Sequence, residues 1–276
     1  MPGTLYVVAT PLGNLGDLTP RAADLLRRVE VVAAEDTRRT RGLLAHLGAG
    51  ARLVSFHAHS GRRRLDTLVE ILREGRDVAL VTDAGTPGVS DPGTELVAAA
   101  RAAGAAVVPL PGPSAVTTAL SASGIPADRY LFLGFVPRKG GERARLLARA
   151  ATEQWAVVLF EGPGRVADLL RDLAALAGPD RPAVVARELT KVHEELRAGT
   201  LAELANYYSM EEPRGEITVV LAGTGVAPEP PDRTGEARAR ALALLGEGLS
   251  RRAAAQQVAA EFGLARNEAY RLVMEL

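Results

Sequence analysis

The sequence contains no cysteine, only two lysines and few aromatic residues. Without cysteine, the chain has no disulfide, no thiolate nucleophile and no zinc site built on sulfur. Aromatic residues make up 4% of the chain, which disfavours a base-stacking platform of the single-strand-binding type. Lys139 and Lys191 stand alone among 33 basic residues. Since nearly every other basic residue is arginine, these two positions are candidates for a role that needs an amine.

A long hydrophobic run and a net charge are also missing. The most apolar stretch, 96–110, contains Arg101 and Pro109 and is shorter than the roughly 20 residues that span a bilayer. The N-terminal residues do not have the pattern of a signal peptide. Because 33 acidic residues cancel the 33 basic ones, a polycationic surface that coats nucleic acid without selection is disfavoured. We therefore expect a soluble cytoplasmic protein with no membrane partner.

The 276 residues are enough for about two domains. In the first part, short apolar segments alternate with helical patterns, and strands are predicted at 5–9, 29–33, 52–56, 78–82 and 106–110. Continuous apolar strands separated by helices are typical of a parallel sheet that is covered on both faces. The pattern predicts an N-terminal α/β domain over 1–116 with a mostly parallel sheet.

A second α/β domain is predicted over 117–224, with a mixed sheet. Its strands are expected at 130–135, 156–160, 184–187 and 217–222, with helical patterns between them. The prolines of 225–235 indicate a linker. The last segment, 236–276, predicts a small appendage of three short helices that is similar to a helix-turn-helix.

Loops rich in glycine and proline follow the first, fourth and fifth predicted strands. The strongest is 82–93, with three glycines and two prolines. Glycines at the end of a strand let the backbone approach a ligand closely, and α/β sheets bind ligands at that edge. A tight loop with buried capping aspartates is the alternative for any one of these segments. No phosphate-binding P-loop motif is present, so we expect a cleft of another kind where the three loops meet.

Six stretches of the chain carry a family resemblance: LYVVATPLGNLGDLTPRA (5–22), AEDTRRT (34–40), ALVTDAGTPGVSDPG (79–93), PLPGPSAVTTALSASG (109–124), FLGFVPRKGGER (132–143) and VARELTKVHEELRAGTLAEL (185–204). In these the chain resembles the tetrapyrrole-methylase superfamily of S-adenosylmethionine-dependent methyltransferases, and within it the bacterial 16S rRNA (cytidine-2′-O)-methyltransferases. Two segments depart from the family pattern. His57-Ala-His-Ser60 lacks the usual asparagine near the histidine, and Glu161-Gly-Pro-Gly-Arg165 lacks the histidine of E-S-P-H-R.

The resemblance implies a two-domain α/β homodimer that binds S-adenosylmethionine in the cleft between its domains and uses no metal. The implied cofactor-binding residues are Pro11, Leu12, Gly13, Asp83, Ala84, Gly85, Thr86, Pro87, Gly88, Pro111, Gly112, Pro113, Ser114, Leu133, Gly134, Ala186 and Arg187. Valine at Gly85 or Gly112 is expected to abolish cofactor binding, because its side chain would fill the space that close backbone approach requires.

The implied reaction is an in-line methyl transfer to a ribose hydroxyl, which needs precise positioning and a group that accepts the hydroxyl proton. Candidates for that role are Asp17, Glu35, Asp36, Glu188 and Lys191. For Glu35 and Asp36 the alternative is a helix N-cap with exposed charges. Lys191 serves as a base only if desolvation lowers its pKa; a phosphate contact is the alternative. The alternating pair His57 and His59 lacks a third ligand nearby, so no metal is expected.

The implied substrate is the decoding region of 16S rRNA, within the small ribosomal subunit. Basic residues proposed to contact it are Arg21, Arg38, Arg62, Arg63, Arg138, Lys139, Arg143 and Arg251. A solvated face is the alternative for each cluster, and the C-terminal helices either contact RNA or pack on the partner subunit. A small-molecule tetrapyrrole methylase and a non-catalytic RNA-binding protein are the alternative functions.

Overall fold

The computed structural model describes residues 1–58, 60–210, 213–225, 234–262, 264 and 266–276. The chain forms two compact units, Met1–Ala227 and Pro228–Leu276, and the first of them contains both β-sheets. Within the described residues, no helix is long and apolar enough to cross a membrane.

The first sheet is entirely parallel, as the continuous apolar strands predicted. Its strands are β1 (Thr4–Val8), β2 (Val31–Ala34), β3 (Arg52–Ser55), β4 (Val78–Val81) and β5 (Ala106–Leu110). They are arranged in the order β3-β2-β4-β1-β5. Every residue of β2 and β4 is buried, because these strands have neighbours on both sides and helices on both faces.

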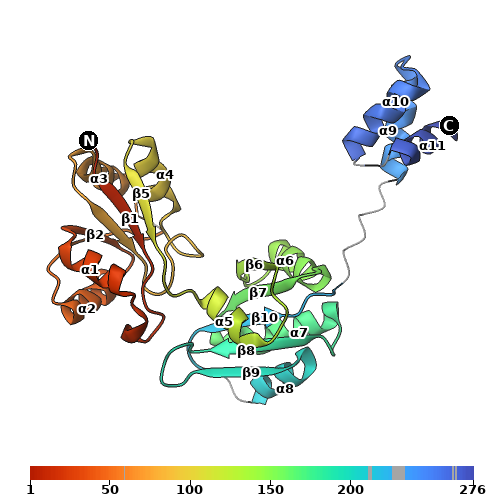
Figure 1. Ribbon diagram of the computed structural model, residues 1–276. Coiled ribbons are helices and arrows are strands. Elements are labelled where there is room, and N and C mark those ends of the chain that lie inside the picture. Colours follow the sequence, from red (N-terminus) through yellow and green to blue (C-terminus); the bar gives the residue numbers. More distant parts are fainter. Residues whose placement is uncertain (59, 211–212, 226–233, 263, 265) are drawn as a thin grey trace. The chain divides into compact units, whose positions relative to one another are not determined.

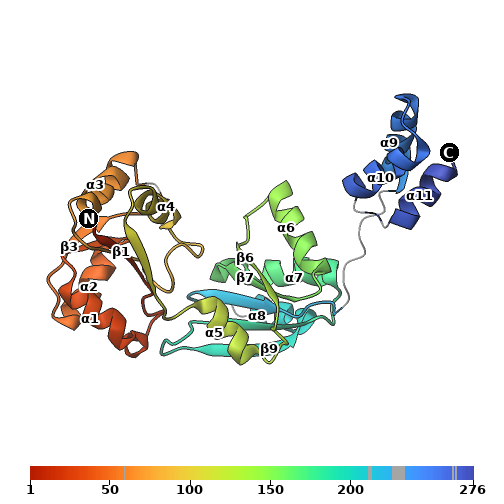
Figure 2. The ribbon, with the colours of Figure 1, turned by 45° about the horizontal axis from the view of Figure 1, so that its top comes forward.

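Helices cover both faces of this sheet (Figures 1 and 2). They are the short 3-10 helix η1 (Leu15–Asp17) and the α-helices α1 (Pro20–Arg28), α2 (Thr37–Leu47), α3 (Arg62–Arg73) and α4 (Thr94–Ala102). One apolar core contains Leu25, Leu26 and Leu44 from α1 and α2. The other contains Leu68 and Leu96 from α3 and α4. α1 begins with Pro20 after the N-cap Thr19, whose Oγ1 accepts from the Ala22 amide at 3.3 Å.

The second sheet is mixed. It contains β6 (Tyr130–Phe135), β7 (Ala156–Glu161), β8 (Pro182–Arg187), β9 (Glu195–Thr200) and β10 (Ile217–Leu221), in the order β6-β7-β10-β8-β9. β6 and β7 are parallel and the other pairs are antiparallel. The strand β9 was not expected from the sequence, because Glu-Leu-Arg-Ala-Gly-Thr lacks a run of apolar side chains. It forms as an edge strand through backbone pairing with β8.

This second sheet also has a helical layer on each face. α5 (Ala115–Ser123) packs through Val116, Ala119 and Leu120 on one face. The core of the other face includes residues of α6 (Gly141–Thr152), α7 (Val166–Ala177) and α8 (Leu201–Met210), with the 3-10 helix η2 (Pro163–Arg165) just before α7. Because α5 follows β5 of the first sheet directly, it joins the two sheets.

The second unit is a bundle of α9 (Thr234–Gly246), α10 (Arg251–Phe262) and α11 (Arg266–Met274). Small residues such as Ala237, Ala241 and Ala254 form its centre, which brings the helices close together. Ser250 caps α10 by accepting from the Ala253 amide at 3.3 Å. Most of the predicted linker, residues 226–233, lies outside the described residues, and α9 already begins at Thr234.

Candidate active site

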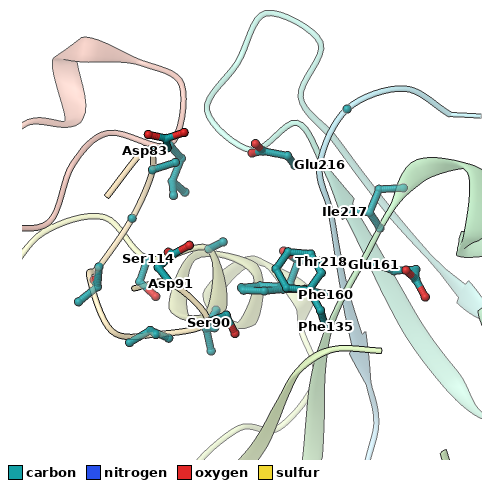
Figure 3. Close-up of a pocket in the computed structure, with 18 of the residues that line it drawn as sticks. Asp83, Ser90, Asp91, Ser114, Phe135, Phe160, Glu161, Glu216, Ile217 and Thr218 are labelled. Atoms are coloured by element: carbon teal, nitrogen blue, oxygen red, sulfur yellow. The ribbon is translucent and has the colours of Figure 1, made fainter. Parts of the chain in front are cut away.

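A cavity of about 320 Å³ lies between the first and second sheets. On one side it is lined by the segments that follow β2, β4 and β5, which all end at the same edge because the sheet is parallel. On the other side it is lined by residues of β6, β7 and β10 (Figure 3). Its volume falls within the range of roughly 300–1,000 Å³ that is typical of small-molecule sites.

Backbone hydrogen bonds join the loops on the first-sheet side. Thr10 and Gly85 exchange two bonds of 2.9 Å between their amides and carbonyls, and the Thr10 hydroxyl donates to the Thr82 carbonyl at 3.0 Å. The Thr86 hydroxyl donates to the Pro113 carbonyl at 3.2 Å. Gly85 adopts φ +83°, which favours glycine. The loops after β1, β4 and β5 therefore form one connected wall.

Carboxylates are concentrated on this wall. Glu35 accepts from the Thr82 hydroxyl at 2.6 Å, and Asp83 accepts from the Asp36 amide at 3.0 Å. Asp91 lines the same cavity, and Glu216 projects toward Asp83 from the second-sheet side (Figure 3). The cavity therefore gathers acidic groups from the two loops that follow β2 and β4 and from the residue just before β10.

Asp91 is the carboxyl group in the cavity whose acidity changes most. Burial raises the pKa of Asp91 to about 6, and the negative charges of Glu35, Asp83 and Glu216 act in the same direction. The neighbouring Thr82 hydroxyl lowers that pKa but does not offset the other effects. Burial also raises the pKa of Asp83. A carboxyl group with a pKa near 6 can accept a proton at neutral pH more readily than an ordinary aspartate.

The opposite wall is largely apolar. Phe135 and Phe160 contact each other with ring centroids 5.3 Å apart, and Ile217 lies beside them. Asp83, Ser90, Asp91 and Ser114 stand across the cavity from this wall (Figure 3). Ser90 also approaches the second sheet: a Cβ placed on Gly134 would lie 3.1 Å from its Oγ. Ser90 has φ +62°, a conformation that costs energy for any residue except glycine.

The predicted cofactor-binding residues divide into two groups. Six line the cavity: Leu12, Asp83, Ala84, Gly85, Thr86 and Ser114. Eleven do not line it: Pro11, Gly13, Pro87, Gly88, Pro111, Gly112, Pro113, Leu133, Gly134, Ala186 and Arg187. Gly112 lies against β1, since a Cβ there would be 3.0 Å from the Ala9 Cβ. The space that a valine side chain would fill at Gly112 is therefore its packing contact with Ala9.

Among the predicted proton acceptors, only Glu35 lines the cavity. Asp36 is the N-cap of α2, as the alternative interpretation proposed, and accepts from the Arg38 amide at 2.8 Å. Hydrogen bonds from Arg38 hold the pKa of Asp36 well below its usual range. Asp17 is exposed in η1.

Lys191 does not line the cavity, but it contacts Glu216, which does. Its Nζ donates to Glu188 at 2.8 Å and to Glu216 at 3.2 Å, and a Cβ placed on Gly13 would be 2.2 Å from its Cγ. Burial lowers the pKa of Lys191, but the hydrogen bond to Glu188 and the charge of Glu216 raise it above its ordinary value overall. Lys191 could act as a base only with a lowered pKa, and in this structure its pKa is raised. Glu188 in turn is held ionised, because the hydrogen bond from Lys191 lowers its pKa.

Most of the predicted RNA contacts lie in or just before the first turns of helices. Arg21, Arg38, Arg62 and Arg63 begin α1, α2 and α3, and all four are exposed. Arg138 and Lys139 are exposed in the loop before α6. Arg143 differs, because only 13% of its side chain is exposed and it pairs with Asp172 at 2.7 Å. Arg251 begins α10 in the second unit.

Several cavity residues were not singled out from the sequence. They are Arg39, Val89, Ser90, Asp91, Ala115, Val116, Phe135, Phe160, Glu161, Gly162, Pro163, Gly215, Glu216, Ile217 and Thr218. Asp91 carried a signal, because it lies in the Ser-Asp-Pro-Gly end of the richest glycine loop. Glu161 carried one as well, because it begins the segment that is compared with the family's E-S-P-H-R. Phe160 and the residues of β10 carried none, since their positions depend on how the second sheet meets the first. Among the described residues, no group of three or more His, Asp or Glu is placed to hold a metal, and His59 lies outside them.

Comparison with known families identifies the chain. The profile of the tetrapyrrole (corrin/porphyrin) methylases matches residues 4–205. The chain belongs to this family. Within it, this methylase is 43% identical over 274 residues to the ribosomal RNA small subunit methyltransferase I of Synechocystis sp. (strain ATCC 27184 / PCC 6803 / Kazusa), covering 99% of this chain and 98% of that protein. It is 42% identical to the protein of that name from Escherichia coli O157:H7, covering 99% and 95%.

Solved structures share the fold of this methylase. A cobalt precorrin-4 methyltransferase superimposes with a TM-score of 0.62 at 20% identity, covering 79% of this chain and 94% of that one. A uroporphyrin-III C-methyltransferase from Thermus thermophilus, complexed with S-adenyl homocysteine, superimposes with a TM-score of 0.59 at 24% identity and covers 80% and 97%. The two-sheet arrangement predicted from the family resemblance is therefore confirmed.

Proposed function

We propose that this methylase transfers the methyl group of S-adenosylmethionine to the ribose 2′-oxygen of a cytidine in the decoding region of 16S rRNA. The observation that carries the proposal is the cavity in which the Asp83–Gly85 loop meets the second sheet. Near-full-length relatives at 42–43% identity are named as small-subunit rRNA methyltransferases, which supports rRNA as the substrate. The protein would act in the cytoplasm as a homodimer.

The chemistry of the cavity suits the cofactor. Leu12, Phe135, Phe160 and Ile217 offer apolar surface to an adenine ring, and the loop backbone around Gly85 can approach the ligand closely. The carboxylates on the first-sheet side, Glu35, Asp83 and Asp91, are suited to cationic groups of a sulfonium amino acid. When bound, the cofactor supplies an activated methyl group. The walls position it and exclude water, which is the main requirement of an in-line displacement.

Asp91 is the group best suited to take the proton from the ribose hydroxyl. It lines the cavity and stands near Glu35, Asp83 and Glu216, whose charges raise its affinity for a proton. Lys191 would remain a cation that orients Glu216 and Glu188 at the rim. Because the pKa of Lys191 is raised, Asp91 takes its place as the proposed proton acceptor.

Exposed basic residues begin three helices of the first sheet. Because the first sheet is parallel, the helices that follow β1, β2 and β3 begin at the same edge as the cavity loops. Arg21, Arg38, Arg62 and Arg63 therefore gather on the cavity side. Such a set can contact phosphates of folded RNA while the overall net charge stays zero.

The test is transfer of a labelled methyl group. We expect incubation of the protein with labelled S-adenosylmethionine and small subunits from cells that lack the enzyme to label 16S rRNA. Nucleoside analysis should then recover the label in 2′-O-methylcytidine. Label in a methylated base would contradict the ribose assignment.

The two alternative functions predict different results in the same experiment. Labelled porphyrinoid, with unlabelled rRNA, would indicate a small-molecule tetrapyrrole methylase. Normal cofactor binding without labelled product would indicate a non-catalytic RNA-binding protein. Small subunits that already carry the modification are the matched control, and they should accept no label.

A further inference from the structure

A second hollow lies beside α6 and α7, on the helical face of the second sheet. Its volume is about 270 Å³, and it is lined by Arg138, Arg143, Arg165, Asp168, Arg171 and Asp172. Four guanidinium groups face two carboxylates, so the lining carries an excess of positive charge. No aromatic side chain lines it, so it offers no surface on which a base could stack.

Two of these arginines are already fixed in position. Arg143 donates to the Pro137 carbonyl at 3.1 Å and to Asp172 at 2.7 Å. Arg165 donates to the Val136 carbonyl at 3.3 Å and forms an ion pair with Glu161. Since their side chains are ordered before any ligand arrives, an anion that binds them loses less conformational entropy than at free arginines.

Glu161 connects this hollow to the cavity between the sheets. It is among the cavity residues, yet its carboxyl group is buried and points away from the first-sheet loops (Figure 3). One oxygen accepts from the Gly162 amide at 2.7 Å. The other has no hydrogen-bond partner among the described residues and lies 3.9 Å from Arg143 Nη1. Glu161, a residue of the cavity wall, thus pairs with two arginines of the hollow, Arg165 and Arg143.

The remaining groups are available to a ligand. Arg138 is exposed and makes no ion pair with any described residue. Arg171 forms an ion pair with Asp168, three residues earlier on the same helix, and its Nε donates to the Ala167 carbonyl at 3.4 Å. Such exposed pairs contribute little. Between Arg138 and Arg143, α6 begins after Gly140, which offers no side-chain cap to the amides of the first turn.

We propose that this hollow binds a phosphodiester of the substrate RNA, next to the nucleotide that enters the cavity. The proposal rests on the proposed function for the identity of the RNA. The planar fork of a guanidinium matches a phosphate better than a lysine does, and the hollow presents four such forks around one space. We therefore add Arg165 and Arg171 to the proposed RNA-binding surface, beside Arg138 and Arg143.

The experiment compares two double variants with equal loss of charge. R138Q/R171Q removes the two exposed arginines of the hollow. R28Q/R73Q is the control, because Arg28 is exposed at the end of α1 and Arg73 pairs with Glu70 as Arg171 pairs with Asp168. The affinity of each for unmodified 16S rRNA and for unmodified small subunits is measured across a salt series, with calorimetry of S-adenosylmethionine binding as the test of folding.

We expect R138Q/R171Q to bind both RNA forms at least about tenfold more weakly and to lower the salt slope by about 1 to 2, while the control changes neither. Cofactor affinity should stay at the wild-type value. Equal affinity and slope in the two double variants would overturn the proposal. A loss confined to assembled subunits would also overturn it, because it would indicate a ribosomal protein as the ligand. Failure of the proposed function is seen separately, as absence of rRNA methylation by the wild-type protein.

Discussion

At the scale of single residues, Asp91 is the cavity carboxyl group whose pKa departs furthest from its ordinary value. Burial raises that pKa to about 6, and the negative charges of three cavity carboxylates, Glu35, Asp83 and Glu216, add to its effect. Such clustering of like charges is unfavourable for folding and is typical of functional sites. The clustering therefore both destabilises the fold and supports catalysis, since a carboxylate that resists ionisation is also a better proton acceptor.

Replacement of Asp91 by asparagine tests the catalytic use. We expect Asp91→Asn to lower single-turnover methylation by about 100-fold or more, because it removes the proton acceptor. In the wild type the rate should rise with pH through about 6 and then level off, as the carboxyl group ionises. The variant should lose this rise. Asp66→Asn, an exposed substitution on α3, is the control. A wild-type pH profile in Asp91→Asn would exclude Asp91 as the base.

The same residue makes a prediction about stability. The folded protein takes up a proton at Asp91 near pH 6, whereas an ordinary aspartate does so near 3.8. The folded state therefore binds more protons between these values, and the free energy of unfolding falls as the pH rises through this window. Asparagine does not ionise. Relative to Asp91→Asn, the wild type should lose about 1 to 3 kcal/mol between pH 4 and pH 7. Chemical unfolding of both proteins at these pH values measures the change, and a constant difference would contradict it.

At the scale of elements, the loops of the first sheet explain why two glycines with similar sequence surroundings differ in role. Gly85 lines the cavity at φ +83° and is paired with Thr10. Gly112 follows β5 without a positive φ and packs against Ala9. A side chain at the first position disturbs a ligand-binding backbone, and one at the second disturbs the contact between the loop after β5 and Ala9, which follows β1.

Valine substitutions should separate these roles. We expect Gly85→Val to weaken S-adenosylmethionine binding at least about 100-fold, because a β-branched residue cannot hold the left-handed conformation and the loop must move. Gly112→Val should instead cost about 1 to 3 kcal/mol of stability through overpacking against Ala9, with a smaller loss of affinity. Calorimetry and chemical unfolding on both variants test this. Near wild-type affinity in a folded Gly85→Val protein would contradict the cofactor assignment.

At the scale of the whole molecule, exposed apolar side chains occur on two loops that contact each other. Val192 is 95% exposed and Leu15 is 46% exposed, and their loops meet where Lys191 packs on Gly13. Apolar groups that lie close together on a surface are suited to a contact with another molecule. A second copy of the chain, as the family resemblance implies, would cover them.

Light scattering tests this assembly. We expect a mass of about twice 29.0 kDa at micromolar concentration. Val192→Asp should shift the mass toward that of one chain, because it places a charge in the contact. Leu176→Asp, at a 54% exposed position on α7, should leave the mass unchanged. A wild-type protein that scatters as a single chain would exclude the homodimer.

The amino-acid sequence alone specifies the elements of the first sheet and the loops that line the cavity on that side. Its strands are continuous apolar segments, and its turns carry glycine and proline at positions where those residues suit the backbone best. Such local constraints can be recognised from neighbouring residues along the chain. Together with the family resemblance, these constraints allowed Glu35, Asp83, Gly85 and Ser114 to be proposed as site residues from the sequence.

The three-dimensional fold is needed to establish which side chains face those loops and what their charges become. Glu216 and Phe160 reach the cavity because β10 and β7 pair in the second sheet, and β9 exists because β8 offers it a backbone partner. The raised pKa of Asp91 likewise depends on burial in the fold and on carboxylates from distant segments, and that of Lys191 depends on the distant Glu216 as well as on the nearby Glu188. Electrostatic interaction and desolvation act through space, so residues that are neighbours only in the fold leave no pattern along the chain.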